Sequence, residues 1–194
     1  MIKRKFREDL TSFNYGDFFS LSRKIMVNQI IREKDFSIVS FNYVKFFNCG
    51  FQKVSFREAK GYSLRFFNCQ FNNISFQKAD FNEISFYNCQ LIDCRFDRAD
   101  LYGLCCINCQ LTNVYFNATD LLDWKIENSQ LATVRFGGSE VENLKIKNST
   151  LKDISCNNLT VVKYVSQNEN DLLTPKTRII NSYTSFLREF VEPN

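Results

Sequence analysis

The sequence of 194 residues has no histidine, only six glycines and two prolines, and no long apolar run. Without histidine, the chain lacks the commonest general base and the commonest ligand of catalytic zinc. So few glycines and prolines exclude collagen-like segments and long flexible linkers. No apolar stretch approaches the length of a membrane span, and none follows the basic residues at the start as it would in a secretory signal. We therefore expect neither a membrane protein nor a secreted one.

Cysteine and charge narrow the range of functions further. Eight cysteines without a secretion signal favour reduced thiols and a cytoplasmic location. The formal net charge of +4 is too small to indicate direct binding of nucleic acid by itself. Cys106 and Cys109 form a CxxC pair, but no second pair and no histidine complete a metal-ligand set. We therefore expect no metal and no cofactor.

Phenylalanine, present 21 times, follows a strict spacing of five residues. Counting from Phe36 to Val161, every fifth position is hydrophobic except Gly61. A second apolar column precedes these positions by two residues, from Val54 to Cys109, and its small and larger side chains largely alternate. Neither an α-helix nor a straight strand keeps such residues on one side. The chain must therefore turn a corner in every unit, so that both columns face one interior.

A longer period of 20 residues indicates how many units make one coil. Asparagine recurs every 20 residues, followed by cysteine in four coils and by serine in the next two. Equivalent residues therefore stack after four units, which predicts a square cross-section with coils about 4.8 Å apart. The asparagines occupy an outward corner and are expected to form a stabilising amide ladder. They are Asn48, Asn68, Asn88, Asn108, Asn128 and Asn148.

These units resemble the pentapeptide-repeat proteins, in which Ala, Asp or Asn, and Leu precede two variable residues. Ala79-Asp80-Phe81 and Ala99-Asp100-Leu101 match this pattern best. The resemblance covers about two-thirds of the chain and implies an all-β solenoid, a right-handed quadrilateral β-helix. Two residues depart from the pattern: Trp124 occupies a place that normally takes a small residue, and Gly61 lacks a core side chain. We expect local distortion near each.

We divide the chain into an N-terminal cap segment (1–35), the repeat β-helix (36–164) and a connector with a C-terminal helix (165–194). Caps are expected because a solenoid leaves both ends of its core open. Thr174-Pro175 is typical of a helix start, and an amphipathic helix over 176–191 should cover the C-terminal end. This helix either caps only or also forms a homodimer, as the resemblance to quinolone-resistance members implies. Its apolar residues are Ile179, Tyr183, Phe186, Leu187 and Phe190.

An outward-facing apolar column is the first candidate for partner binding. Four stacked apolar side chains are unusual on a soluble surface. Either the N-terminal segment folds over them or a protein partner docks there. Cys105 also faces outward and is the one plausible reactive thiol, whereas Cys106 and Cys109 face inward as core. The members of the apolar column are Phe47, Phe67, Tyr87 and Ile107.

An acidic column is the second candidate. Like charges about 4.8 Å apart repel by about 1 kcal/mol even in water, so an offsetting contact is expected. Lys78 and Arg98 are placed to pair with the first two carboxylates, and hydrogen bonds to the turn backbone are the structural alternative. The members are Asp80, Asp100, Asp120 and Glu140.

The resemblance gives the acidic column a functional interpretation as well. Quinolone-resistance members of the family imitate duplex DNA and occupy the DNA-binding saddle of DNA gyrase. Those members are strongly acidic, whereas residues 36–164 carry 14 basic and 12 acidic residues. A near-neutral rod is a poor electrostatic mimic, because affinity for a DNA saddle should scale with the charges presented.

No catalytic constellation is visible in the repeat, and a filled rod offers no concave site. We expect a non-enzymatic, rod-like module that binds an unidentified protein partner. The alternative is a DNA mimic that binds a type II topoisomerase and protects it from quinolones. Neither hypothesis involves direct binding of nucleic acid or a membrane.

Overall fold

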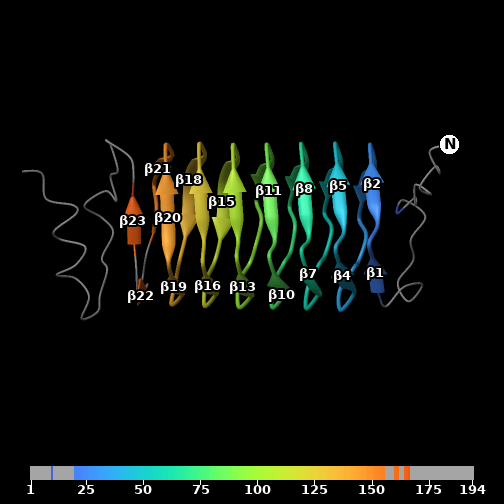
Figure 1. The fold of residues 1–194 in the computed structure, drawn as a ribbon, viewed down its shortest axis with the longest axis horizontal. Coiled ribbons are helices and arrows are strands. Elements are labelled where there is room, and N and C mark those ends of the chain that lie inside the picture. Colours follow the sequence, from blue (N-terminus) through green and yellow to red (C-terminus); the bar gives the residue numbers. More distant parts are fainter. Residues whose placement is uncertain (1–9, 11–19, 156–159, 162–163, 167–194) are drawn as a thin grey trace, which may run out of the picture.

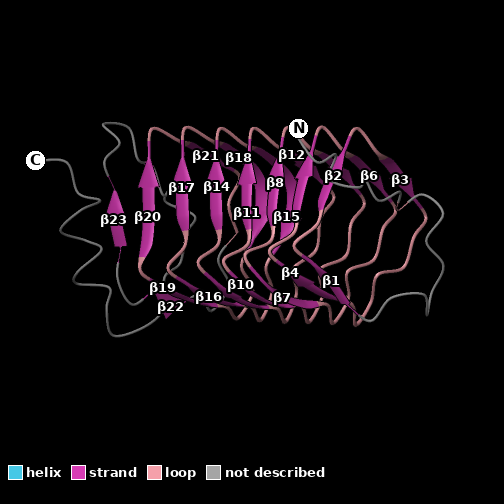
Figure 2. Ribbon diagram, turned by 45° about the vertical axis from the view of Figure 1, so that its right-hand side comes forward, coloured by secondary structure: helices cyan, strands magenta, loops and turns pink. Residues whose placement is uncertain are grey.

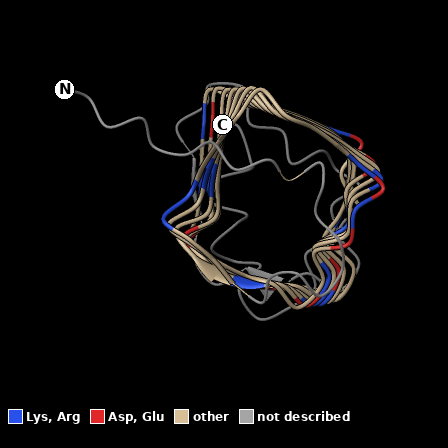
Figure 3. Cartoon of the chain, turned by 90° about the vertical axis from the view of Figure 1, so that its right-hand side faces the viewer, with Lys and Arg blue, Asp and Glu red and all other residues tan. Residues whose placement is uncertain are grey.

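The computed structural model describes residues 10, 20–155, 160–161 and 164–166. This part of the chain winds as a rod of stacked coils with short parallel strands on three sides (Figures 1 and 2). Viewed along the axis, the coils have a four-sided outline (Figure 3). Within the described ranges, no helix is long and apolar enough to cross a membrane. The predicted quadrilateral all-β solenoid is confirmed.

Each of the three sheets takes one strand from every coil. Sheet A contains β1 (Ser20–Ser22), β4 (Ser40–Asn42), β7 (Lys60–Tyr62), β10 (Asp80–Asn82), β13 (Asp100–Tyr102), β16 (Asp120–Leu122), β19 (Glu140–Glu142) and β22 (Thr160–Val161). Sheet B contains β2 (Ile25–Val27), β5 (Lys45–Phe47), β8 (Arg65–Phe67), β11 (Ser85–Tyr87), β14 (Cys105–Ile107), β17 (Lys125–Glu127), β20 (Leu144–Lys147) and β23 (Tyr164–Ser166). Sheet C contains β3 (Ile30–Arg32), β6 (Gly50–Gln52), β9 (Gln70–Asn72), β12 (Gln90–Ile92), β15 (Gln110–Tyr115), β18 (Gln130–Arg135) and β21 (Thr150–Lys152).

The strands pair so that each residue lies opposite the residue 20 positions further on. Phe46 lies opposite Phe66, and Phe66 opposite Phe86. This register stacks identical positions of successive coils, which confirms the period of 20 residues. Backbone groups thereby find partners in the coils above and below, so a rod without helices leaves few of them unpaired.

The fourth side, here called the turn side, is built from β-turns joined by isolated bridges. Ser55 bridges to Ser75, and Ser75 to Arg95. The turn at Phe56 closes with a hydrogen bond of 3.1 Å from the Ala59 N–H to the Phe56 carbonyl. Glu58 at the third turn position has a φ of 56°, which is the geometry of a type II turn.

The interior is filled by the two predicted apolar columns on each side. On the turn side, stacked rings run along the rod, with centroids 5.0 Å apart between Phe56 and Phe76 and 4.7 Å between Phe76 and Phe96. The second column, two residues before the first in each unit, has small residues at the tight turn corner. Ala59 and Ala79 are buried there. Successive residues of this column lie on different sides of the coil. Their alternation between small and larger side chains follows from that.

Trp124 lies in a column of large residues, so the expectation of a small residue there was wrong. Its equivalents in the preceding coils are Leu64, Ile84 and Leu104, and all are buried. The register continues past Trp124, since the Lys145 N–H donates to its carbonyl at 2.9 Å. The indole fits because it replaces a large side chain.

At Gly61 the backbone of the preceding coil comes close to the chain. A Cβ built on Gly61 would lie 2.0 Å from the carbonyl oxygen of Phe41 in the preceding coil. The strand pairing with Phe41 and Phe81 is nevertheless kept. Gly61 thus accommodates a close backbone approach, which a side chain would prevent.

The described coils begin before the predicted boundary at residue 36. Leu21, Met26 and Ile31 are buried and extend the spacing of five residues backwards by three units. The predicted boundary was too late because the five-residue spacing was counted from a phenylalanine, Phe36. Leu, Met and Ile fill the same interior position in the earlier units. Leu10 is also buried, and its N–H donates to Gln29 Oε1 at 3.1 Å. The predicted C-terminal helix and its apolar residues lie outside the described residues.

Each five-residue unit from Arg23 to Asp153 has one residue in the left-handed region, with φ between 48° and 68°. Asparagine tolerates this conformation better than most other residues. The asparagine column therefore has a backbone cause in addition to its amide ladder. β-branched residues are the least suited to this position, and Ile38 adopts it with a φ of 62°.

Replacing Ile38 by asparagine is expected to raise the free energy of unfolding by about 1 kcal/mol, because the left-handed strain is relieved. Ile38 is 51% exposed, so little apolar contact is lost. Equilibrium unfolding in urea measures the change. The matched control is Ile30→Asn at an exposed strand position in β3, where no gain is expected. An equal gain at both sites would contradict this explanation.

Candidate partner-binding surface

The predicted apolar column lies on the outer face of sheet B, and we call it the apolar stripe. The rings of Phe47 and Phe67 stack at 4.7 Å with 7° between their planes, and those of Phe67 and Tyr87 at 4.9 Å with 8°. Val27 pairs with Phe47 and extends the stripe by one coil, which the sequence prediction missed. All five side chains, including Ile107, are half-buried. Because the rings stack along the axis, they cover each other's faces and present their edges.

A basic column runs beside the apolar stripe on the same strands. Lys45 and Arg65 occupy the first residues of β5 and β8, two positions before Phe47 and Phe67. Aromatic ring edges carry partial positive charge. The N-terminal half of sheet B is therefore both apolar and electropositive. The signal for this was present in the sequence, since the lysine and arginine share the repeat frame of the phenylalanines.

The stripe ends after Ile107, as predicted, because the column continues with charged residues. Glu127 forms ion pairs with Lys125 at 2.7 Å and with Lys147 at 4.0 Å. The hydrogen bond from Lys125 lowers the pKa of Glu127. Glu127 is thus paired with cations of its own and the next coil, whereas the apolar stripe itself contains no charged residue.

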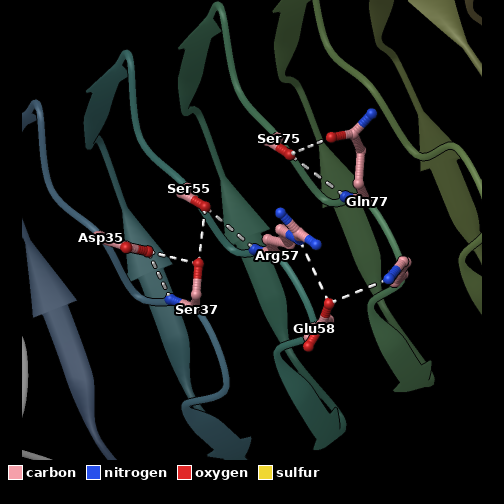
Figure 4. Close-up of polar contacts among 8 residues, drawn as sticks. Asp35, Ser37, Ser55, Arg57, Glu58, Ser75 and Gln77 are labelled. Carbon is pink, nitrogen blue, oxygen red and sulfur yellow. Dashed lines mark hydrogen bonds and ion pairs between the residues drawn. The ribbon is translucent and has the colours of Figure 1, made fainter.

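The four residues of the acidic column lie side by side on sheet A, with Asp100 between Asp80 and Asp120. All four are exposed. Within the described part of the chain, their carboxylates make no hydrogen bond or ion pair. The predicted pair of Lys78 with Asp80 was wrong, because Lys78 Nζ lies 3.3 Å from Glu58 Oε1 on the preceding turn. Glu58 makes a second contact, with Arg57 Nε at 3.3 Å (Figure 4).

Partial burial raises the pKa of Asp100, and the charges of Asp80 and Asp120 raise it further. A raised carboxyl pKa means that the folded state binds the proton more tightly than the unfolded state. Stability is therefore lost as the pH rises from the ordinary pKa of 3.8 through the raised value. The fold therefore holds Asp100 ionised at an electrostatic cost at neutral pH.

Replacing Asp100 by asparagine is expected to stabilise the protein at pH 7 by roughly 0.2–1 kcal/mol, the range for a charge pair across neighbouring strands. The gain should vanish well below the ordinary carboxyl pKa, where the wild-type group is protonated as well. Thermal unfolding at the two pH values measures it. Asp93→Asn is the control, because Asp93 already accepts a hydrogen bond from Asn113 at 3.1 Å. A gain that is independent of pH would contradict the electrostatic cause.

The asparagine column and the cysteines have structural roles. The Asn68 amide donates to Asn48 at 3.2 Å, and the Asn88 amide to Asn68 at 3.1 Å, so the predicted ladder is confirmed. Cys106 and Cys109 are buried, as expected for core residues. Burial raises the pKa of Cys105, which is half-buried, and this makes its thiol less reactive than predicted. Among the described residues, no group of His, Cys, Asp or Glu side chains could hold a metal ion.

The comparison with protein-family models agrees with the repeat architecture. The family model described as pentapeptide repeats (8 copies) matches residues 65–103 and 79–117. No curated protein sequence matches the chain. Full-length QnrB1, a plasmid-mediated fluoroquinolone resistance protein, aligns with a TM-score of 0.47 and 13% identity over 75% of this chain and 92% of its own. HetL, a pentapeptide-repeat protein involved in heterocyst differentiation regulation in Nostoc sp. strain PCC 7120, aligns with a TM-score of 0.24 and 9% identity over 79% and 92%.

Proposed function

We propose that this chain, which belongs to the pentapeptide-repeat family, is a non-enzymatic cytoplasmic rod that binds a protein partner through sheet B. The observation that carries the proposal is the apolar stripe: three stacked aromatic rings between aliphatic residues on an outer sheet face. Apolar surface of this kind usually marks an interaction site. The regular rise of the coils presents the rings at fixed spacing on a rigid support, which suits a docking surface.

Enzymatic activity is not part of the proposal, because the described coils leave little room for a catalytic site. The interior positions are filled by buried side chains along the rod. Some outer columns, such as the asparagine column and the acidic column, repeat one type of side chain from coil to coil. Catalysis instead needs different groups that converge on one concave site.

Replacing Phe67 by aspartate is expected to abolish partner binding while leaving the fold intact, because the side chain is outside the core. The measurement is affinity capture from the native host with mass spectrometry, comparing wild type and variant side by side. Gln90→Asp on the outer face of sheet C is the matched control and should retain the partner. If Phe67→Asp captures the same proteins in the same amounts, the stripe is not the docking surface.

A second function is favoured by the acidic column. Its four exposed carboxylates lack partners among the described residues and recur once per coil, as a row of phosphates would. On this alternative, the chain is a DNA mimic that binds DNA gyrase and protects it from quinolones. It predicts that the purified protein restores gyrase supercoiling in the presence of a quinolone. The double change Asp100→Lys with Asp120→Lys should remove the effect, and no rescue over a wide concentration range would end this alternative.

We further propose that the segments flanking the coils act as caps. The helix expected over 176–191 would cover the apolar C-terminal end of the core, and dimerisation through Ile179, Tyr183, Phe186, Leu187 and Phe190 is the additional role considered for it. Light scattering of the full chain distinguishes a monomer from a dimer. Since closed two-fold dimers are the commonest oligomers, Phe186→Asp should convert such a dimer to monomers.

A further inference from the structure

A groove of about 500 Å³ lies along the corner between sheets A and B in the N-terminal coils, and we call it the corner groove. It spans the turns that connect β1 to β2, β4 to β5 and β7 to β8. The groove combines basic, aromatic and aliphatic side chains. They are Arg23, Ile25, Tyr43, Lys45, Tyr62, Ser63, Arg65 and Glu83.

The charges of the corner groove favour an anionic ligand. Three cationic side chains face one carboxylate, and that carboxylate is already engaged. Glu83 accepts a hydrogen bond from Tyr62 Oη at 2.9 Å and lies 3.9 Å from Arg65 Nη2. The side chains of Arg23 and Lys45 make no hydrogen bond or ion pair with a described residue. Two positive charges are therefore available to a ligand.

The aromatic residues give the groove an apolar wall. The rings of Tyr43 and Tyr62 meet edge to face, with centroids 5.2 Å apart, and the two residues are 51% and 37% exposed. The hydrogen bond to Glu83 holds Tyr62 in place. A ligand that brings only charge would leave this wall bare, so the groove suits an anion attached to an apolar or peptide framework.

The corner groove is continuous with the apolar stripe. Lys45 follows Tyr43 and precedes Phe47 on one coil, and Arg65 precedes Phe67 on the next. Lys45 and Arg65 therefore lie between the tyrosines of the corner groove and the aromatic rings of the apolar stripe. A partner seated on the stripe would have to satisfy these charges at its edge.

We infer that the corner groove binds an acidic peptide segment of the partner, with its carboxylates on Arg23 and Lys45 and its apolar residues on the stripe. This inference rests on the proposed function of sheet B. Single-stranded nucleic acid is the competing polyanion, but it binds by stacking bases on exposed ring faces. The stripe presents ring edges instead, because its rings cover one another.

The test uses the full chain and two fluorescein-labelled probes: a short synthetic peptide that alternates glutamate with leucine, and a single-stranded oligonucleotide of similar length. Fluorescence anisotropy should show binding of the acidic peptide that weakens with salt. Arg23→Glu with Lys45→Glu should weaken it at least about tenfold, or about 1.4 kcal/mol. Lys125→Glu, in the same column but outside the groove and paired with Glu127, is the matched control and should change the affinity less than about twofold.

Three results would overturn the inference: no binding of the acidic peptide, unchanged affinity in the double variant, or tighter binding of the oligonucleotide. Circular dichroism melts confirm that the variants are folded, and Arg23→Gln with Lys45→Gln provides a milder pair. If the native partner is lost in Phe67→Asp but kept in the double variant, the docking surface stands and the groove assignment fails. If the peptide binds the groove while Phe67→Asp keeps the native partner, the groove stands and the proposed function fails.

Discussion

Replacing Phe76 by alanine is expected to lower the free energy of unfolding by about 3–5 kcal/mol. The Phe76 ring is fully buried and stacks between Phe56 and Phe96, with 5.0 Å and 4.7 Å between centroids. Its removal leaves a cavity with a ring on either side. The coils cannot close this gap easily, because hydrogen bonds between strands fix their spacing. Equilibrium unfolding in guanidinium chloride measures the loss.

Phe47→Ala is the matched control for this prediction. Phe47 also stacks on an equivalent ring in the next coil, at 4.7 Å from Phe67, but it is half-buried on the outer face. Its removal leaves a surface notch rather than a cavity, so we expect a clearly smaller loss of stability. Equal losses at the two sites would mean that ring stacking, not interior filling, determines the cost. A loss below about 1 kcal/mol for Phe76→Ala would show that the coils do collapse around the cavity.

Replacing Gly61 by leucine is expected to destabilise the protein by roughly 1–3 kcal/mol or more. The repeat frame alone suggests the opposite, since a hydrophobe occupies the equivalent position in the neighbouring units. In the structure, however, a Cβ at Gly61 would lie 2.0 Å from the carbonyl oxygen and 2.8 Å from the carbonyl carbon of Phe41. Backbone cannot move aside as a flexible side chain can. The coils around Gly61 would have to separate, and strand pairing would weaken.

Thermal unfolding of Gly61→Leu and Gly61→Ala measures this effect, and both should unfold at lower temperature than the wild type. Gly50→Ala is the control, because a Cβ at Gly50 meets nothing within 4 Å. Gly50 lies in β6, so alanine there should be neutral or slightly stabilising. A more stable Gly61→Leu variant would show that the position accepts a core side chain after all.

The contacts of the charged side chains could not be predicted from the sequence. Lys78 pairs with Glu58 of the preceding coil instead of Asp80 on its own. Arg65 contacts Glu83, which is 18 residues away in the sequence and lies across the corner groove. The partner that a long side chain contacts in a neighbouring coil depends on the local geometry and on its rotamer. The repeat frame specifies neither.

By itself, the sequence determined the coil. A hydrophobe every five residues, with asparagine every 20, allows one interior and one register, because side-chain direction follows backbone parity. The same rule placed Phe67 outside and Phe66 inside. Only the tertiary structure decided why Gly61 excludes a side chain and that Tyr43, Lys45 and Arg65 line one groove. These features depend on distances between atoms of different coils, and the periodicity of a single chain does not contain them.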